Sequence, residues 1–228
     1  MARGVDRRTG RSRPGVLTEE EQCESGGAGL TLVIVALVAA SAWAQTSPTV
    51  DDLLQMLRAG GYVIVFRHGA TYPDQADTDP LNPGNIAQQR QLNDKGRDDA
   101  KAVGEALKAA GVPIGKSYSS QFNRAVETAR LIGGKDPSTT SDVSEGGLVV
   151  SPNENNRRAQ AFRALLGAMP DSGTNTLIVT HKPNILDALG KDWFEVGEGE
   201  ASMFKPEGGG KYSLIGRVQI GQWTAANR

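Results

Sequence analysis

Thiols and imidazoles are scarce in this chain of 228 residues, which has one cysteine, Cys23, and two histidines. A single cysteine excludes a disulfide within the chain and a metal centre built from several cysteines. Lys and Arg number 25 against 26 Asp and Glu, so no overall field attracts nucleic acid or an anionic membrane surface. An anion-binding site must therefore be formed locally, by a few well-placed cations.

Long apolar runs are also lacking. The run "LTLVIVALVAA" at 30–40 is shorter than the roughly 20 residues of a membrane-spanning helix. It is followed by "SAWAQ", in which Ala42 and Ala44 form the small pair of an A-x-A cleavage site. We therefore expect export, to the periplasm, with residues 1–44 as N-terminal extension and signal peptide and residues 45–228 as one domain. A membrane anchor formed by residues 30–44 is the alternative.

Helical and strand patterns alternate along the rest of the chain. The runs "YVIVF" at 62–66 and "TNTLIVTH" at 174–181 are typical of strands buried on both faces, as in a parallel sheet. We expect further strands at 116–120 and, joined by a glycine turn, within 202–220. We expect helices at 49–59, from Asn93 to 111, and at 121–134, 155–169 and 183–190. The order predicts an α/β fold, a three-layer sandwich with a mostly parallel central sheet flanked by helices.

The polar stretch at 70–92 is unusually long for a loop of an ordered domain. It contains three prolines and the acidic residues Asp74, Asp77 and Asp79. Long loops without secondary structure are commonly functional, so we expect this one at the rim of an active site. Its acidic residues are either solvated or select against highly anionic substrates.

Both histidines follow directly on an apolar strand. The carboxyl ends of parallel strands are where sites form in open α/β sheets, so we expect His68 and His181 at one rim. Arg67 adjoins His68, Arg124 lies in the first turns of a predicted helix, and another helix starts near Pro183. Guanidinium groups and helix N-termini are suited to binding a phosphate dianion.

Three segments carry a family resemblance. "RHGAT" at 67–71, "SSQFNRAVETA" at 119–129 and "VTHKPN" at 179–184 resemble, in order and spacing, the signature segments of the histidine phosphatase superfamily, also called phosphoglycerate mutase-like. "LNDKGRDDA" at 92–100 is similar to the family's helix after the first loop. The resemblance covers 62 to about 190 and implies the phosphoglycerate mutase-like fold.

The resemblance also implies site roles. His68 would be the nucleophile that takes the phosphoryl group, and Arg67, Arg124 and His181 would form the pocket around it. Two guanidinium groups and a second imidazole can neutralise charge on the transferring group. No metal and no cofactor are implied. For Arg124, an ordinary surface pair with a neighbouring glutamate is the alternative.

The sequence does not identify a single residue as the proton donor for the leaving group. Some family members have an aspartate directly after the second histidine, where this chain has Lys182. Others supply a glutamate from the segment between the arginine helix and the second histidine, which leaves Glu145 and Glu154 as candidates. Glu200 is a more distant third candidate. Without a donor, good leaving groups would be favoured, because proton donation contributes about 10²–10⁴-fold.

Two residues are further candidates for contacting substrate. Arg90 and Thr71 could do so, although Arg90 is alternatively a solvated loop charge. The expected function is a metal-independent phosphatase that acts through phosphohistidine on a phosphorylated small molecule or glycan. An exported phosphate-binding protein without turnover is the alternative, and a phosphomutase is disfavoured by export.

Overall fold

The computed structural model describes residues 48–146 and 150–225. The predicted leader or anchor, residues 1–44, lies outside the described residues. Within the described ranges, no helix combines the length and the apolar character of a membrane span.

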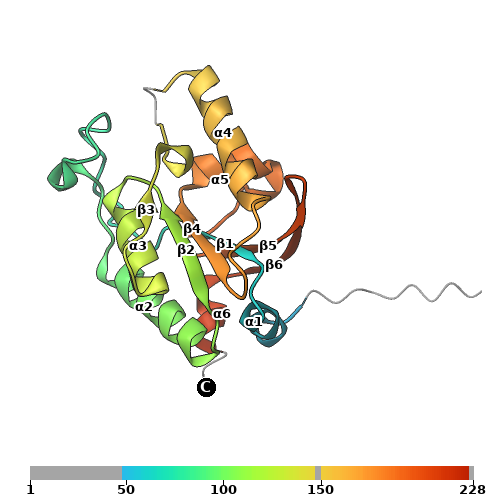
Figure 1. Ribbon diagram of the computed structural model, residues 1–228. Helices are drawn as coiled ribbons and strands as arrows, with labels where there is room; N and C mark the ends of the chain where they lie inside the picture. Colours follow the sequence, from blue (N-terminus) through green and yellow to red (C-terminus); the bar gives the residue numbers. More distant parts are fainter. Residues whose placement is uncertain (1–47, 147–149, 226–228) are drawn as a thin grey trace, which may run out of the picture. The chain divides into compact units, whose positions relative to one another are not determined.

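A mixed sheet forms the centre of the fold (Figure 1). Six strands in the described part of the chain pair in the order β3-β2-β4-β1-β5-β6. Four are parallel: β1 (Val63–Arg67), β2 (Ile114–Ser119), β3 (Ser138–Thr139) and β4 (Asn175–Thr180). The last two form an antiparallel hairpin: β5 (Ala201–Gly208) and β6 (Lys211–Val218). This arrangement confirms the predicted α/β fold with its mostly parallel sheet.

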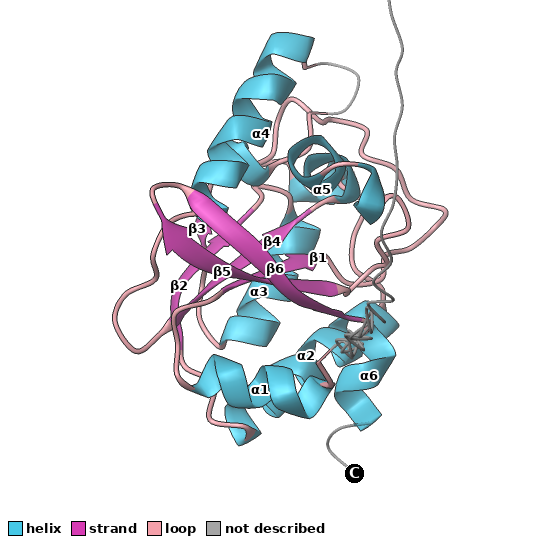
Figure 2. Cartoon of the chain, turned by 90° about the vertical axis from the view of Figure 1, so that its right-hand side faces the viewer, coloured by secondary structure: helices cyan, strands magenta, loops and turns pink. Residues whose placement is uncertain are grey.

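Helices cover both faces of the sheet. They are α1 (Val50–Arg58), α2 (Asp94–Ala109), α3 (Asn123–Gly133), α4 (Pro152–Leu166), α5 (Lys182–Leu189) and α6 (Ile220–Ala225). Figure 2 shows α4 and α5 on one side of the sheet and α1, α2 and α6 on the other. The short elements β3 and α6 were not predicted, since neither is long enough to show a period.

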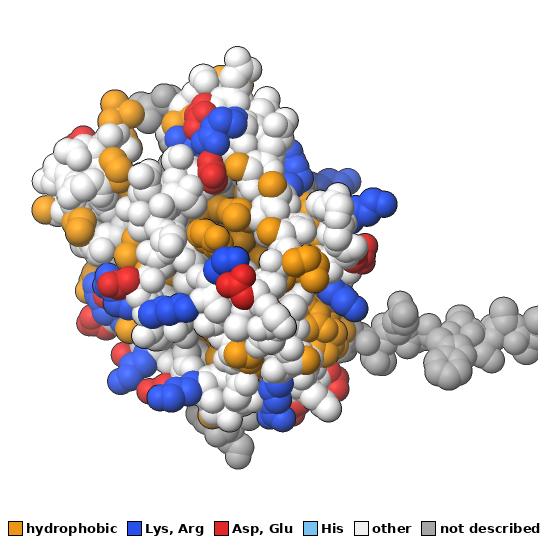
Figure 3. Space-filling model, viewed as in Figure 1, with side chains coloured by type: hydrophobic (Ala, Val, Ile, Leu, Met, Phe, Trp, Pro, Cys, Tyr) orange, Lys and Arg blue, Asp and Glu red, His pale blue; other side chains and the backbone are white. Residues whose placement is uncertain are grey.

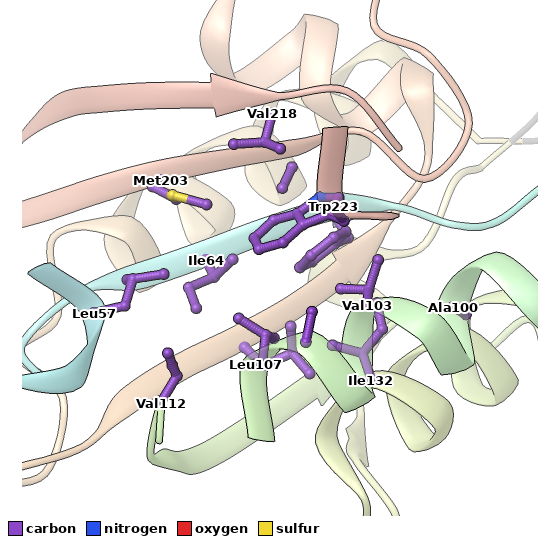
Figure 4. Close-up of a cluster of buried hydrophobic side chains, with 14 of the residues drawn as sticks. Leu57, Ile64, Ala100, Val103, Leu107, Val112, Ile132, Met203, Val218 and Trp223 are labelled. Carbon is purple, nitrogen blue, oxygen red and sulfur yellow. The ribbon is translucent and has the colours of Figure 1, made fainter. Parts of the chain in front are cut away.

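Strand alternation divides the core into two clusters. Ile64 and Phe66 of β1 pack with α1, α2, α3 and α6, while Val63 and Val65 face α4 and α5. Trp223 of α6 reaches into the first cluster toward Ile64, as Figure 4 shows, and its ring centroid lies 6.1 Å from that of Phe66. Since β1 is buried on both faces, the residues that follow it start from a rigid base.

The segment after β1 packs tightly against the start of α2. Asn93 caps this helix, and its Oδ1 accepts a hydrogen bond from Gly96 N at 2.8 Å. A Cβ on Gly96 would lie 2.1 Å from the carbonyl oxygen of Ala70, and one on Gly69 would lie 2.8 Å from that of Gly96. Only glycine at both positions allows this approach, which holds the chain just beyond His68 in place.

Candidate active site

His68 and His181 lie side by side at the carboxyl ends of neighbouring strands. β1 and β4 pair in parallel, with Arg67 opposite Thr180. The next ladder bond runs from His68 N to Thr180 O at 3.0 Å. The two ring centroids are 5.1 Å apart, and the residues are only 2% and 1% exposed. The sheet itself therefore sets the spacing of the imidazoles.

The hydrogen bond of the His68 ring defines its tautomer. Nδ1 lies 2.8 Å from the carbonyl oxygen of Gly69. A carbonyl oxygen can only accept, so Nδ1 carries the hydrogen and Nε2 carries the lone pair. The pKa of His68 is lowered to about 3, mainly by burial. The hydrogen bond to Gly69 opposes this shift, and the charges of Arg124, Arg67 and Arg90 act in the same direction as burial. The imidazole is therefore neutral at physiological pH, with a free nitrogen.

His181 is held from two sides. Its Nε2 lies 2.7 Å from Ser120 Oγ, and its ring contacts Phe122 edge to face at 5.5 Å. Its Nδ1 lies 3.5 Å from Glu145 Oε1, without forming a hydrogen bond. Burial holds the pKa of His181 well below its usual value, and the charge of Arg124 acts in the same direction. Both imidazoles of the site are thus neutral.

Arg124 is fully buried near the start of α3 and faces two carboxylates. Its terminal nitrogens donate to Asp77 Oδ1 at 2.9 Å and Oδ2 at 3.1 Å. It also pairs with Glu145, and its guanidinium lies 4.6 Å from the centroid of the Phe122 ring. The alternative of a surface pair with Glu127 does not hold, because Glu127 instead accepts from Arg97.

The turn of α3 that carries Arg124 is tied to the histidine segment. Thr128 Oγ1 donates to Arg124 O at 2.7 Å and accepts from Gly69 N at 3.1 Å. On the other side, Ser120 N donates to Val179 O at 3.0 Å. The motif residues of the second segment thus connect the arginine helix to both histidine strands.

Arg67 is braced by the segment before β5. Its side chain donates to Val196 O at 2.8 Å and lies 3.5 Å from Glu198 Oε1. Gly199 N donates to the carbonyl oxygens of both Arg67 and His68, at 3.1 and 2.9 Å. Burial lowers the pKa of Arg67, an effect that the charge of Glu198 opposes. The guanidinium remains charged, since arginine does not lose its proton in proteins.

Arg90 brings a third cation close to the histidines. Its positive charge lowers the pKa of both His68 and His181, and its backbone N–H donates to Asp77 Oδ1 at 3.0 Å. Its guanidinium has no ion pair or hydrogen bond with the described residues. Arg90 is therefore available to contact an anion.

Three of the four buried side-chain nitrogens without a partner in the described residues lie at this site; the fourth is Trp223 Nε1 in the core. Among the described residues, Arg67 Nε, Arg124 Nε and His181 Nδ1 are buried and have no hydrogen-bond partner. Buried polar groups normally have one, and two of these three are obligate donors on cations. A tetrahedral oxyanion, with several acceptor oxygens, fits this donor set.

The three candidate proton donors lie in different surroundings. Glu145 is at the pocket, next to Arg124 and His181. Glu154 is in the first turn of α4, where hydrogen bonds from Arg157 and Arg158 lower its pKa to about 2. Glu200 is 1% exposed, and its partners are Arg217, Gln219 and the backbone of Gly197. Of the three, the structure brings Glu145 to the histidines.

Glu198, which is not among the predicted site residues, reaches the site instead of Glu200. It pairs with Arg67, and its Oε1 accepts from Thr71 Oγ1 at 3.0 Å. Thr71 is buried, and its hydroxyl hydrogen is used in this bond. The two glutamates stand two positions apart in "GEGE", and nothing in that pattern distinguishes them.

The chemistry present consists of imidazoles, guanidinium groups and carboxylates. No group of three or more His, Cys, Asp or Glu side chains within 48–146 and 150–225 is placed to hold a metal ion. In Figure 3, basic and acidic side chains are interspersed over the visible face, in keeping with the even charge balance. The cations of the site are thus a local grouping, as the composition requires.

Neutral histidines and buried arginines thus lie together at the carboxyl ends of β1 and β4. Residues 63–146 match the model of the histidine phosphatase superfamily (branch 1). The match includes Arg67, His68 and Arg124 and ends before His181. Residues 63–146 are therefore similar to the histidine phosphatase superfamily, as the signature segments at 67–71 and 119–129 predicted.

Several solved structures are similar to this chain. The protein histidine phosphatase SixA complexed with tungstate has a TM-score of 0.52 and 18% identity, over 70% of this chain and 97% of its own. A mycobacterial glucosyl-3-phosphoglycerate phosphatase has a TM-score of 0.49 and 16% identity, over 70% of this chain and 99% of its own. A phosphoserine phosphatase mutant from Entamoeba histolytica, in complex with phosphoserine, has a TM-score of 0.47 and 17% identity, over 71% of this chain and 98% of its own. At 18% identity, the likeness to SixA concerns the fold. No curated protein sequence matches the chain.

Proposed function

We propose that this protein is a phosphatase that hydrolyses phosphate monoesters through a phosphohistidine on His68. The main support is the orientation of the His68 ring: Nδ1 is committed to Gly69 O at 2.8 Å, which leaves Nε2 unprotonated beside buried cations. The match of residues 63–146 to the model of the histidine phosphatase superfamily supports phosphatase activity in general. The substrate is a phosphorylated small molecule or glycan.

In the first step, the Nε2 lone pair attacks phosphorus and the bond from phosphorus to the leaving oxygen breaks. The hydrogen on Nδ1 stays in place, and Gly69 O stabilises the positive charge that develops on the imidazole. Arg67 and Arg124 balance the negative charge on the non-bridging oxygens, and Arg90 can add a third cation. His181 contributes an N–H as a neutral donor.

We propose Glu145 as the group that protonates the leaving oxygen. Of the three candidates it is the one next to Arg124 and His181, with Oε1 3.5 Å from His181 Nδ1. In the second step, water attacks the phosphohistidine, its proton passes to the Glu145 carboxylate, and the phosphorus–nitrogen bond breaks. Inorganic phosphate leaves, His68 is neutral again and Glu145 carries a proton.

The test is phosphate release by the full-length chain and its His68→Ala variant. The substrates are an aryl phosphate, a panel of sugar phosphates and phosphoserine. We expect the wild type to release phosphate and the variant to lose activity by several orders of magnitude. Rapid quenching with a 32P-labelled substrate should trap an acid-labile, base-stable phosphoprotein in the wild type. Equal phosphate release by the two proteins would refute the catalytic role of His68.

The same experiment separates the alternatives. If both proteins bind phosphate esters but neither turns them over, the protein is a phosphate-binding protein. If transfer between positions of a phosphosugar exceeds hydrolysis, it is a phosphomutase. As a matched control, His181→Ala should also impair turnover but leave His68 able to accept a phosphoryl group.

We also propose that the protein is exported and acts in the periplasm. This proposal rests on the apolar run at 30–40 and the Ala42–Ala44 pair. N-terminal sequencing of the protein from its native host tests it, with cleavage expected near Gln45. A mature N-terminus upstream of Leu30 would refute it, and an intact chain in the membrane fraction would support the anchor.

A further inference from the structure

One carboxylate of the long loop reaches into the site. Asp77, in the segment 72–91 between β1 and α2, accepts hydrogen bonds from both terminal nitrogens of Arg124, at 2.9 and 3.1 Å. The two residues are 47 positions apart. The Arg124 side chain is 0% exposed and that of Asp77 20%. A loop residue thus provides the most extensive hydrogen bonding to a buried cation of the pocket.

The geometry of this contact fixes the plane of the guanidinium. A guanidinium has five N–H groups in a rigid fork, and a carboxylate that binds both terminal nitrogens restricts its position and its rotation. Glu145 contacts one terminal nitrogen, which alone leaves rotation free. Nε, on a different edge of the fork, is buried without a partner. The two hydrogen bonds to Asp77 therefore orient the Arg124 guanidinium and leave its Nε–H as a donor for a phosphoryl oxygen.

Asp77 also links two cations of the site. Its Oδ1 accepts from the backbone N–H of Arg90 at 3.0 Å, in addition to the bond from Arg124. Backbone hydrogen bonds join the two halves of the loop on either side of Asp77. Thr78 N donates to Gln88 O at 2.9 Å, and Tyr72 N donates to Gln91 O at 3.2 Å. Asp77 thereby holds the backbone at Arg90 beside the Arg124 guanidinium.

The other acidic residues of the loop do not share this role. Asp79 accepts from Asn85 Nδ2 at 2.9 Å, a contact within the loop. Asp74 is exposed and makes no ion pair or side-chain hydrogen bond with the described residues. It carries the same charge in the same loop, three positions away. Asp74 therefore offers a matched control for the loss of a carboxylate.

We infer that Asp77 is a positioning residue, which holds the Arg124 guanidinium in the orientation that receives the phosphoryl group. The inference rests on the proposed phosphoryl-binding role of Arg124. It differs from a gate, in which Asp77 would compete with phosphate for Arg124. The two cases predict opposite effects: removing a positioning carboxylate weakens phosphate binding, whereas removing a competing one strengthens it.

The experiment measures binding of inorganic phosphate by calorimetry to the full-length chain. The proteins are wild type, Asp77→Asn, Asp74→Asn, Arg124→Ala and the double variant with Asp77→Asn and Arg124→Ala. We expect Asp77→Asn to weaken binding at least about tenfold, since charge-assisted bidentate bonds are strong. Asp74→Asn should stay within about twofold of wild type. On the Arg124→Ala background, Asp77→Asn should have almost no further effect, because Asp77 acts through Arg124.

Other outcomes overturn the inference. These are an Asp77→Asn protein that binds phosphate as tightly as Asp74→Asn, or more tightly, and a wild type that binds no phosphate. An equal loss on the Arg124→Ala background would mean that Asp77 acts by another route. If Asp77→Asn does not fold by circular dichroism, Asp77→Glu replaces it. That variant keeps the charge but shifts the carboxylate by one methylene, and we expect weaker binding from it too.

Turnover supplies the second readout. With an aryl phosphate, Asp77→Asn should raise KM more than it lowers kcat, while Asp74→Asn changes neither. A general loss of folded protein would lower kcat in proportion and leave KM unchanged. If the wild type binds phosphate but releases none from any ester, the proposed hydrolysis fails, while the binding measurements still decide the role of Asp77.

Discussion

Neutral, buried histidines make the folding stability of this protein dependent on pH. Burial is the main cause that holds the pKa of His68 at about 3 in the folded chain, against an ordinary value of 6.5. As the pH falls through 6.5, the unfolded chain takes up a proton on this imidazole and the folded chain does not. Proton uptake stabilises the unfolded state, so the free energy of unfolding decreases until the pH approaches 3.

The size of the effect follows from the shift. One pKa unit corresponds to about 1.4 kcal/mol, so the shift of His68 from 6.5 to about 3 is worth at most about 5 kcal/mol. Between pH 7 and pH 5, an unfolded imidazole goes from about one quarter protonated to nearly fully protonated, which amounts to about 2 kcal/mol. His181, whose pKa is also lowered by burial, contributes in the same direction.

The assay is urea unfolding of the full-length chain, followed by tryptophan fluorescence at pH 7, 6 and 5. His68 and His181 are the only histidines in the chain, so the variant with both changed to asparagine has no imidazole left. We expect the wild type to lose about 2 kcal/mol or more between pH 7 and 5, and the variant to lose much less. Asp74→Asn is the control. Equal losses in wild type and double variant would refute the reasoning.

Three further predictions concern single residues. Glu145→Gln should slow turnover of alkyl phosphates by about 10²–10⁴-fold and of aryl phosphates less, because an aryl oxygen leaves without full protonation; initial rates on both substrates check this. Gly96→Ala would place a Cβ 2.1 Å from a backbone oxygen, so urea unfolding should show a loss of about 1–3 kcal/mol that Gly84→Ala does not. Glu200→Gln weakens a buried pair with Arg217, and thermal unfolding should show a loss of about 1–3 kcal/mol.

Each of these predictions has a contrary result. Equal rate losses on alkyl and aryl phosphates would remove Glu145 as the proton donor. An unchanged unfolding midpoint for Gly96→Ala would mean that the segment after β1 can move away from α2 at no cost. For Glu200→Gln, a Tm equal to that of the wild type would show that the pair with Arg217 contributes nothing net to stability, as happens for some buried ion pairs.

The sequence carries strong information about the strands and the histidines. β1 and β4 are apolar on both faces, a pattern that only central strands of a covered sheet require. A residue directly after such a strand must lie at the carboxyl edge, so the positions of His68 and His181 follow from the chain itself. The side-by-side pairing of their strands could not be derived from this pattern, because strand order depends on long-range packing.

The carboxylates of the site could not be identified in the same way. Asp74, Asp77 and Asp79 stand within six residues of a loop that has no period, and only the closure of the loop decides which one meets Arg124. Glu198 and Glu200 are similarly alike in sequence. One reaches Arg67, and the other is buried against β6. Such choices depend on tertiary contacts between segments far apart in the chain.

The ladder bond from His68 N to Thr180 O separates what is constant in this site from what can diverge. Since the sheet sets the spacing of the imidazoles, changes in the 72–91 loop should leave that spacing undisturbed. With Asp77 as a positioning residue, a changed loop must still return a carboxylate to Arg124, and it must also keep Arg90 near the histidines.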